Sequence, residues 1–250
     1  MTANEAVPQL DIVIPVYNEA HVLAGSIERL RSFLQETSFP YTWRIVIADN
    51  ASTDATLSVA RVLEDRFGDV APLHLPQKGR GRALRKAWLE SDADAMCYMD
   101  VDLSTDLSCL LPLAKAVLDD GYDLAYGSRM TRGSQVTRSL RREITSRGLI
   151  TLIKLLFFSR LSDTQCGFKS ITRQAAHELL PLVENEEWFF DTELLLLAEK
   201  GGYRLREVPV RWLEDQDSRV NVRKTVGEDL GGLLRMRRRR IPRRGAASRR

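Results

Sequence analysis

Short apolar runs and stretches of helical periodicity alternate along the first part of the chain. The runs predict buried strands over residues 10–16, 43–48, 70–75 and 95–99, and the periodic stretches predict helices over residues 20–36, 55–67 and 83–91. Strands that are continuous apolar runs and alternate with helices are typical of a parallel sheet covered by helices on both faces. The sequence therefore predicts an α/β fold with a mostly parallel central sheet.

The alternation weakens beyond residue 105. Helices are predicted over residues 108–119, 173–180, 188–200 and 226–236, strands over 124–127 and 205–212, and loops over 163–169 and 214–221. The stretch 137–158 is basic at its start and apolar later, which indicates an amphipathic segment. Because the chain shows no linker and no internal repeat, residues 1–229 are expected to form a single domain, followed by a basic tail over 230–250.

Polar side chains follow the predicted strands at the point where each strand ends. Glu19 follows the first strand, Asp49 closes the second, Lys78 follows the third, and Asp100 and Asp102 follow the fourth. Ligands of such sheets bind at the carboxyl ends of the strands, so these residues are expected to meet at one edge. Asp49 would accept hydrogen bonds there from a base N–H or a ribose hydroxyl, unless it belongs to a helix-capping cluster.

Two carboxylates one residue apart end the fourth predicted strand. Side chains at positions i and i+2 point the same way from an extended backbone, so Asp100 and Asp102 are expected to face each other. A hard divalent cation with oxygen ligands, Mg²⁺ or Mn²⁺, would balance their charge and would arrive together with substrate phosphates. A turn with two solvated aspartates is the alternative.

Several other classes of site lack their sequence motifs. Neither G-x-G-x-x-G nor G-x-x-x-x-G-K-[ST] occurs, which argues against dinucleotide and P-loop sites. The three cysteines form no C-x-x-C pair, which argues against a disulfide framework and for a reducing compartment. No apolar run reaches the ~18 residues of a spanning helix. The N-terminus carries no signal pattern, and a cytoplasmic location is expected.

Two stretches before residue 160 are rich in cations. In residues 78–82, glycines alternate with cations just ahead of a helix, a pattern that favours anions but also suits a solvated loop. In the amphipathic segment, Arg138 and Arg142 lie one helical turn apart, ahead of the apolar stretch. This arrangement suits a phosphate held at a membrane surface. A core helix with a solvated basic start fits the same pattern.

Two further regions carry concentrated charge. Asp191 and Glu193 follow an aromatic run and are candidates for acceptor positioning or base catalysis, although acids in a first helical turn also suit the helix dipole. From residue 230 onward the chain has many arginines and no acid. Anionic lipid headgroups attract such segments by about 1 kcal/mol per charge. A peripheral attachment to the cytoplasmic face of a membrane is therefore expected, with a disordered tail as the alternative. Nucleic-acid binding is disfavoured, because aromatics do not interleave with the arginines.

Several of these segments together resemble a known enzyme family. Residues 11–19 (Asp-Ile-Val-Ile-Pro-Val-Tyr-Asn-Glu), Asp49, 100–102 (Asp-Val-Asp) and 127–129 (Gly-Ser-Arg) resemble family 2 glycosyltransferases of the Rossmann-like GT-A fold. Residues 163–169 (Asp-Thr-Gln-Cys-Gly-Phe-Lys), 190–193 (Phe-Asp-Thr-Glu), 207–210 and 218–220 resemble the dolichyl-phosphate (polyprenyl-phosphate) β-glucosyltransferase branch, which is related to dolichol-phosphate mannose synthases. The resemblance extends to about residue 233.

The resemblance implies inverting transfer of a sugar, glucose from UDP-glucose, to a polyprenyl or dolichyl phosphate. It implies a nucleotide-sugar site formed by Pro15, Tyr17, Glu19, Asp49, Lys78, Asp100 and Arg219. It implies Mg²⁺ or Mn²⁺ at Asp100 and Asp102. Asp191, identified above from its place after the aromatic run, is the third catalytic candidate. The resemblance also implies an acceptor-phosphate site formed by Arg129, Arg142, Ser146 and Gln165.

Three alternatives to this activity stay open. The first is a soluble family 2 enzyme that acts on a hydroxyl of a polysaccharide or small molecule. The second is transfer of mannose from GDP-mannose to the lipid phosphate. The third is a sugar-nucleotide-binding regulator without activity, which the intact pair of aspartates disfavours. The sequence also leaves a homo-oligomer open.

Overall fold

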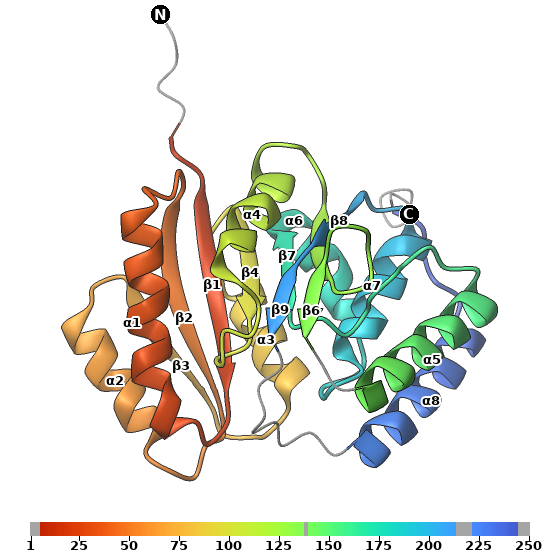
Figure 1. Ribbon diagram of the computed structural model, residues 1–250, viewed down its shortest axis with the longest axis horizontal. Helices are drawn as coiled ribbons and strands as arrows, with labels where there is room; N and C mark the ends of the chain where they lie inside the picture. The colour runs from red at the N-terminus through yellow and green to blue at the C-terminus, as the bar shows by residue number, and fades with distance from the viewer. Residues whose placement is uncertain (1–5, 138–139, 214–221, 245–250) are drawn as a thin grey trace, which may run out of the picture.

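The fold is built on one large sheet in a computed structural model that describes residues 6–137, 140–213 and 222–244. Seven strands of this part of the chain pair in the order β3-β2-β1-β4-β7-β5-β8 (Figure 1). Their bounds are β1 Gln9–Val16, β2 Thr42–Asn50, β3 Val70–Leu75, β4 Ala95–Met99, β5 Leu124–Ser128, β7 Phe168–Thr172 and β8 Leu205–Pro209. Only β7 runs antiparallel to its neighbours, so the predicted mostly parallel sheet is confirmed.

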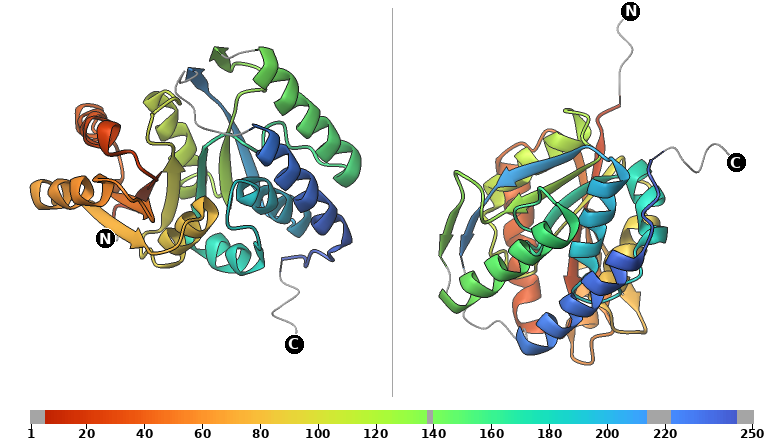
Figure 2. Two further views of the ribbon diagram at one scale, coloured as in Figure 1. Left: turned by 90° about the horizontal axis from the view of Figure 1, so that it is seen from below. Right: turned by 90° about the vertical axis from the view of Figure 1, so that its right-hand side faces the viewer.

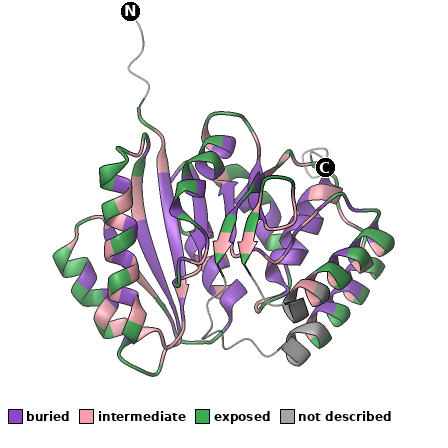
Figure 3. Ribbon diagram, in the orientation of Figure 1, coloured by how far each residue is buried: buried purple, intermediate pink, exposed green. Residues whose placement is uncertain are grey.

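Helices cover both faces of this sheet, as predicted. One face carries α1 (Ala20–Glu36), α2 (Thr56–Arg66) and α4 (Leu110–Leu118), and the other carries α3 (Arg80–Leu89), α5 (Leu140–Phe157), α6 (Arg173–Leu179), α7 (Phe190–Gly201) and α8 (Val222–Arg238). Alternate side chains of each strand supply the two cores: Ile12 and Ile14 of β1 pack toward α1, while Val13 packs toward α3. Figure 3 shows the central strands β1 and β4 as mostly buried and the outer sides of α1 and α2 as exposed.

The predicted and observed elements agree best in the first half of the chain. The observed α1, β3 and β4 have the predicted bounds. β1 is one residue longer than predicted, and β2 is three residues longer. The helix predicted over residues 83–91 begins earlier, at Arg80. This difference places Arg80 in the first turn of α3 instead of in a loop.

Two strands were not predicted. β7 begins within the segment expected to be a loop, and its polar residues Lys169 and Ser170 are buried in the middle of the sheet. These residues interrupt the apolar pattern from which strands are predicted. The short β6 (Gln135–Thr137) pairs with β9 (Arg211–Leu213) as a separate ribbon, so the strand expected over residues 205–212 is divided between two sheets.

The C-terminal arginines do not all lie apart from the domain. Helix α8 continues across the predicted boundary at residue 229, and its Leu233 and Met236 are buried. Arg235 and Arg239 form ion pairs with Glu184 and with the buried Glu193 of α7. Helices α5 and α8 lie side by side on this flank of the molecule (Figure 2). Among the described helices, none combines the length and hydropathy that a membrane crossing requires.

Candidate active site

Four sharp loops shape the carboxyl edge of the parallel strands. The loops after β1, β2 and β4 each contain a residue with left-handed backbone, respectively Asn18 (φ 55°), Ala51 (φ 59°) and Leu103 (φ 51°). The loop after β3 turns through Gly79, whose N–H donates a hydrogen bond of 2.6 Å to Asn50 Oδ1 at the end of β2. These turns hold the predicted polar residues at the edge of the sheet.

Four of the predicted nucleotide residues lie at the end of β1 or on the loops after β1 and β3. Lys78 Nζ stands 3.4 Å from the centre of the Tyr17 ring, so the loops after β3 and β1 touch through a cation–π contact. The backbone N–H of Glu19 donates to the Thr56 hydroxyl at the start of α2. Pro15 pairs with Ala48 inside the sheet. The structure thus brings these four residues close to the end of β2, which carries Asp49.

Asp49 is completely buried, with 0% of its surface exposed. His74 is its neighbour on β3, and His74 Nδ1 lies 2.7 Å from Asp49 Oδ2. The other carboxylate oxygen accepts the backbone N–H of Ser52 at 3.2 Å. His74 was not singled out from the sequence, because its role depends on the register between two strands.

The chain turns directly after β4, so the extended backbone expected through Asp100 and Asp102 is not observed. The N–H of Leu103 donates to the Asp100 carbonyl across the turn. Asp102 is exposed, and its Oδ1 accepts the N–H of Ser104 at 2.9 Å. Asp100 is half-buried, and its Oδ1 lies 3.0 Å from Arg80 Nη2. The two carboxylates therefore have different environments.

This pair suits a divalent cation that is bound together with a phosphorylated ligand. Among residues 6–137, 140–213 and 222–244, no three His, Cys, Asp or Glu side chains gather closely enough to hold a metal by themselves. Mg²⁺ and Mn²⁺ accept such incomplete sets, because one or two carboxylates can be completed by water and phosphate oxygens. The exposed Asp102 carboxylate and the half-exposed Asp100 offer oxygen ligands of that kind.

Asp100 is the solvent-facing member of a cluster of charged and polar side chains that is otherwise buried. Arg80 bridges two carboxylates, since its Nη1 lies 2.7 Å from Asp191 Oδ2 while its Nη2 holds Asp100. Lys169 Nζ lies 3.1 Å from the other oxygen of Asp191, which also accepts the hydroxyl of Tyr98. We call these five residues the Arg80 cluster. It connects α3, β4, β7 and α7, and its two cations balance its two carboxylates.

Electrostatics keep Asp191 ionised. Burial alone would raise the pKa of its carboxyl group, but Lys169 and Arg80 outweigh burial and hold that pKa below its usual range. Burial and the nearby Asp191 charge raise the pKa of the Tyr98 hydroxyl. Asp191 thus has three donors and little exposed surface, whereas a general base must reach the proton that it removes.

The predicted acceptor residues are placed only in part. Arg129, just after β5, forms a two-point ion pair with the buried Asp163, with Nε–Oδ2 2.8 Å and Nη2–Oδ1 3.0 Å. Burial lowers the pKa of Arg129, but Asp163 outweighs it and raises that pKa overall. Ser146 lies half-buried on α5. Arg138 and Arg219 lie outside the described residues. Arg142 belongs to α5, but its side chain is also outside the described part.

Gln165 connects the loop before β7 to helix α8. Its Nε2 donates to Asp229 Oδ2 at 2.9 Å. Burial and the charge of Glu228 raise the pKa of Asp229 to about 6, although the hydrogen bond from Gln165 lowers it. Gln165 therefore holds a carboxylate that the sequence did not identify as part of a site.

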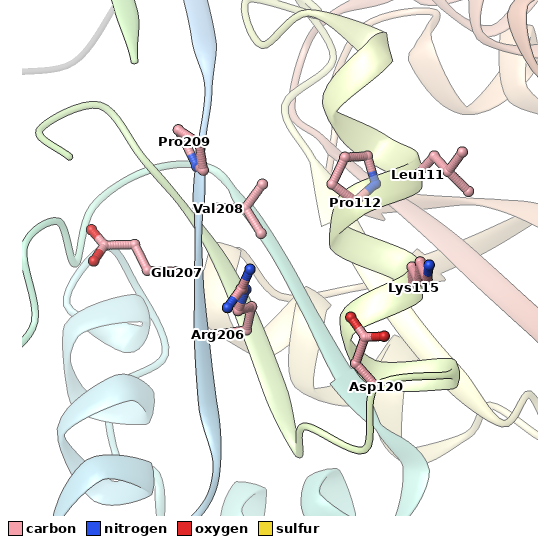
Figure 4. A pocket seen from close by; sticks show the side chains of 8 residues that line it. All are labelled: Leu111, Pro112, Lys115, Asp120, Arg206, Glu207, Val208 and Pro209. Carbon is pink, nitrogen blue, oxygen red and sulfur yellow. The ribbon is translucent and has the colours of Figure 1, made fainter. Parts of the chain in front are cut away.

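A second concave region lies away from these residues. A groove of about 310 Å³ separates α4 from the edge strand β8, and Figure 4 shows Val208 and Arg206 on the side of α4. Glu207 also lines the groove, but its side chain extends on the side of β8 opposite to α4, and its carboxylate accepts a hydrogen bond from the hydroxyl of Ser162. None of the predicted site residues lines this groove.

The family assignment follows from comparison with known proteins. The model of "Glycosyl transferase family 2" matches residues 11–180, a segment that includes β1 to β5, β7 and the Asp100–Asp102 turn. The chain belongs to glycosyl transferase family 2. The resemblance predicted from the sequence motifs is thereby confirmed.

Similar members of the family include enzymes named for a lipid phosphate. The chain is 34% identical over 225 residues to glycosyltransferase AglD of Haloferax volcanii, covering 88% of this chain and 35% of that protein. It is 32% identical over 225 residues to the dolichyl-phosphate beta-glucosyltransferase of Drosophila melanogaster, covering 85% and 69%. The chain thus spans about a third of AglD and about two thirds of the second relative.

Solved structures support the GT-A fold of this glycosyltransferase. Glucosyl-3-phosphoglycerate synthase from Mycobacterium tuberculosis, in complex with Mn²⁺, UDP and its product, superposes with a TM-score of 0.67 at 15% identity. The match covers 92% of this chain and 80% of that one. Mannosyl-3-phosphoglycerate synthase from Rubrobacter xylanophilus gives a TM-score of 0.65 at 17% identity, covering 92% and 74%. At these identities the comparison bears on the fold alone.

Proposed function

We propose that this family 2 glycosyltransferase transfers glucose from UDP-glucose to a dolichyl or other polyprenyl phosphate, with inversion at the sugar. The observation that carries the proposal is the 32% sequence identity to a dolichyl-phosphate beta-glucosyltransferase over 85% of the chain. Placement of Asp100 and Asp102 at the carboxyl edge supports it, because a nucleotide diphosphate needs oxygen ligands and a cation at that position.

At the donor end, Asp102 with Asp100 would hold Mg²⁺ or Mn²⁺. When bound, the ion would neutralise the negative charge that develops on the leaving nucleoside diphosphate. The chain's own residues orient the rest of the donor. Tyr17 and Lys78 present a ring and a cation to it, and Arg80 fixes the orientation of Asp100. Arg219 is proposed to act at the diphosphate.

At the acceptor end, no strong base is needed. A phosphate monoester has its second pKa near 6 and is largely ionised at pH 7. The arginines and polar groups of the second half, Arg129, Arg142, Ser146 and Gln165, would then hold and orient the incoming anion. Asp163 fixes the guanidinium of Arg129 from behind, which keeps its charge in one place. Asp191 would act as a positioning residue within the Arg80 cluster.

We further propose that the α5–α8 flank contacts an anionic membrane at the cytoplasmic face. At the end of α5, Leu155 and Phe158 are 70% and 84% exposed, and Leu234 of α8 is 58% exposed. Arg237, Arg238 and Arg240 follow Leu234 along the chain and are exposed, and Arg237 Nη1 donates to the Leu156 carbonyl of α5 at 2.8 Å. Apolar side chains beside arginines suit the boundary between headgroups and acyl chains. The buried free cysteines agree with a reducing compartment.

The activity is tested by incubating the full chain with Mg²⁺ or Mn²⁺, a panel of UDP- and GDP-sugars, and a polyprenyl phosphate. The lipid product is then identified by mass. A polyprenyl-phosphate glucose formed from UDP-glucose is the expected result. A mannosyl lipid formed only from GDP-mannose would overturn the donor assignment. Transfer to hydroxyl acceptors without any lipid product would overturn the acceptor assignment.

The membrane contact is tested by flotation with vesicles. Wild-type protein should float with vesicles containing anionic lipid and much less with neutral vesicles. The double substitution Leu155→Ser with Phe158→Ser should weaken flotation, while Val62→Ser, an exposed apolar residue on α2, should not. Equal flotation of all three proteins would contradict the assignment. A gel shift with duplex DNA at the same salt concentration should show no complex.

A further inference from the structure

At the end of strand β2, the sequence predicts that Asp49 faces a ligand. In the structure, His74 of the neighbouring strand β3 is the residue exposed to solvent there. Asp49 has no exposed surface, and both of its carboxylate oxygens have partners on the protein. His74 covers it, and 43% of the His74 side chain is exposed. A ligand that approaches this position from solvent therefore meets the imidazole ring before it meets the carboxylate.

The ion-pair geometry determines which ring nitrogen faces outward. An ionised carboxylate can only accept hydrogen bonds, so the hydrogen in the 2.7 Å contact belongs to His74 Nδ1. The other nitrogen, Nε2, is on the far side of the ring from Asp49. In a neutral ring with its hydrogen on Nδ1, Nε2 carries a lone pair and accepts a hydrogen bond.

The position of this pair in the sheet indicates which part of a nucleotide could reach it. Strands β3 and β2 lie three and two places from β4 in the sheet order. With neighbouring strands about 4.8 Å apart, the pair lies on the order of 10–15 Å from the Asp100–Asp102 turn. A diphosphate bound at that turn does not extend so far, whereas its nucleoside does. The Tyr17–Lys78 contact lies on the loops of β1 and β3 along that path.

We propose that His74 contacts the base of the donor nucleotide through Nε2, and that Asp49 is a positioning residue acting through His74. This inference rests on the proposed function and extends it to a uridine nucleotide. Uracil carries one ring N–H, at N3, and this is the donor that an outward-facing acceptor would bind. Asp49 fixes both the orientation and the tautomer of the ring, as a buried carboxylate does for other histidines.

The first test measures UDP binding to the full-length protein by titration calorimetry with Mg²⁺. His74→Ala should weaken UDP binding about three- to tenfold, the range expected for one hydrogen bond. N3-methyl-UDP should bind wild-type protein as weakly as UDP binds His74→Ala, and the substitution should not weaken it further. The control His177→Ala removes an exposed histidine of α6, whose preceding strand ends at the opposite edge, and should bind UDP like wild type.

The second test is a double-mutant cycle with Asp49→Asn. If Asp49 acts through His74, Asp49→Asn weakens UDP binding in the wild-type background and has little effect in the His74→Ala background. A full and additive loss in both backgrounds would overturn the positioning role and favour direct contact between Asp49 and the base. Thermal unfolding of each variant identifies any loss of folded protein, which matters for the buried Asp49 and not for the exposed His74.

The outcomes separate this inference from the proposed function. If wild-type protein binds no UDP, the UDP donor itself is wrong. If wild-type protein binds UDP but His74→Ala and N3-methyl-UDP leave the affinity unchanged, the inference is wrong and the proposed donor stands. A loss that 2′-deoxy-UDP reproduces and N3-methyl-UDP does not would place the contact at the ribose and overturn the base assignment.

Discussion

Strands β4 and β7 are neighbours in the sheet and are both buried, yet only β4 has an apolar sequence. The five residues of β4 lie in the two hydrophobic cores, and only the hydroxyl of Tyr98 among their side chains contacts charged groups, those of Asp191 and Lys169. The centre of β7 holds Lys169 and Ser170, and Lys169 depends on Asp191 of α7 for its counter-charge. Two strands with similar burial are thus stabilised in different ways.

The difference separates two tasks within one sheet. The apolar strand β4 in the first half is followed by Asp100 and the exposed Asp102, whose carboxylates a ligand can reach. In the second half, ion pairs such as Lys169–Asp191 and Arg129–Asp163 lie inside the structure and set its geometry. Substitutions at the end of β4 should therefore change activity more than stability. Substitutions in the Lys169–Asp191 pair should do the reverse.

The largest effect is expected for Asp102→Ala. Loss of this carboxylate removes an oxygen ligand for the cation, and transfer should fall about 100-fold or more, since a bound cation supplies several kcal/mol of charge stabilisation. Unfolding should be nearly unchanged, because Asp102 is exposed. Product formation and thermal unfolding are measured together. Asp65→Ala, an exposed carboxylate on α2, serves as the control. Full activity of Asp102→Ala, or of wild type in excess EDTA, would contradict the site.

Asp191→Asn should show the opposite pattern. The substitution leaves two cations, Lys169 and Arg80, with Asp100 as the remaining carboxylate of the cluster, and the free energy of unfolding should fall on the order of 3 kcal/mol. Transfer should remain measurable, because Asp191 positions groups and does not remove a proton. Loss of nearly all transfer with intact UDP binding would instead identify a base that activates a hydroxyl acceptor.

The pH dependence of stability provides a second readout on Asp191. Its pKa is lowered in the folded state, so its contribution is complete above the usual carboxyl pKa and is lost as the pH falls through the lowered pKa. The stability difference between wild type and Asp191→Asn should therefore shrink under acid conditions. Urea unfolding between pH 3 and pH 7 measures it, and a difference that stays constant would argue against the ionised state.

Gly167→Ala tests the contact between the two halves. A Cβ at this position would lie 1.8 Å from Asp100 Oδ2, so the carboxylate would have to move. We expect transfer to fall about tenfold and stability to fall by about 1–2 kcal/mol, as for a small overpacking change. Gly148→Ala on α5, where a Cβ meets nothing within 4 Å, is the matched control. If the double variant Gly167→Ala with Asp100→Ser is no more stable than Gly167→Ala alone, the clash is not the cause.

The smallest effect is expected for Asp229→Asn. The folded protein raises the pKa of Asp229 to about 6, and Oδ1 is buried without a hydrogen-bond partner among the described residues. A carboxyl group with a raised pKa costs stability as the pH rises from its usual pKa through 6. The variant should therefore be more stable than wild type at pH 8 by about 1–2 kcal/mol, and the gain should vanish near pH 4. An equal gain at both pH values would contradict this account.

The same contrast explains which elements could be predicted from the sequence. Helix α1 and strands β3 and β4 follow directly from apolar periodicity, and so does the edge at which Asp49, Lys78 and Asp100 lie. Strand β7 could not be predicted in this way, because its buried lysine is acceptable only when Asp191, more than twenty residues later, is placed beside it. A local pattern does not contain that partner.

The site residues divide in a similar manner. The positions of Asp102 and Lys78 follow from the ends of strands, whereas the contacts of Arg80 and His74 depend on tertiary packing. Arg80 meets Asp191 across 111 positions of sequence, and His74 meets Asp49 only through the register of β2 and β3. The sequence shows the cation-rich loop of residues 78–82 and the Asp-Thr-Gln-Cys-Gly-Phe-Lys segment as motifs. It does not show that Arg80 and Lys169, one from each segment, both pair with Asp191.

The antiparallel placement of β7 also has a consequence for how the chain is made. Strands β1 to β4 are neighbours in the sheet, in the order β3-β2-β1-β4. They can therefore pair with one another as soon as β4 has left the ribosome. β5 has no place beside them until β7, more than forty residues later, has been translated and inserted against β4. A nascent chain halted before residue 168 would expose one edge of β4, and such an unpaired edge is a template for aggregation.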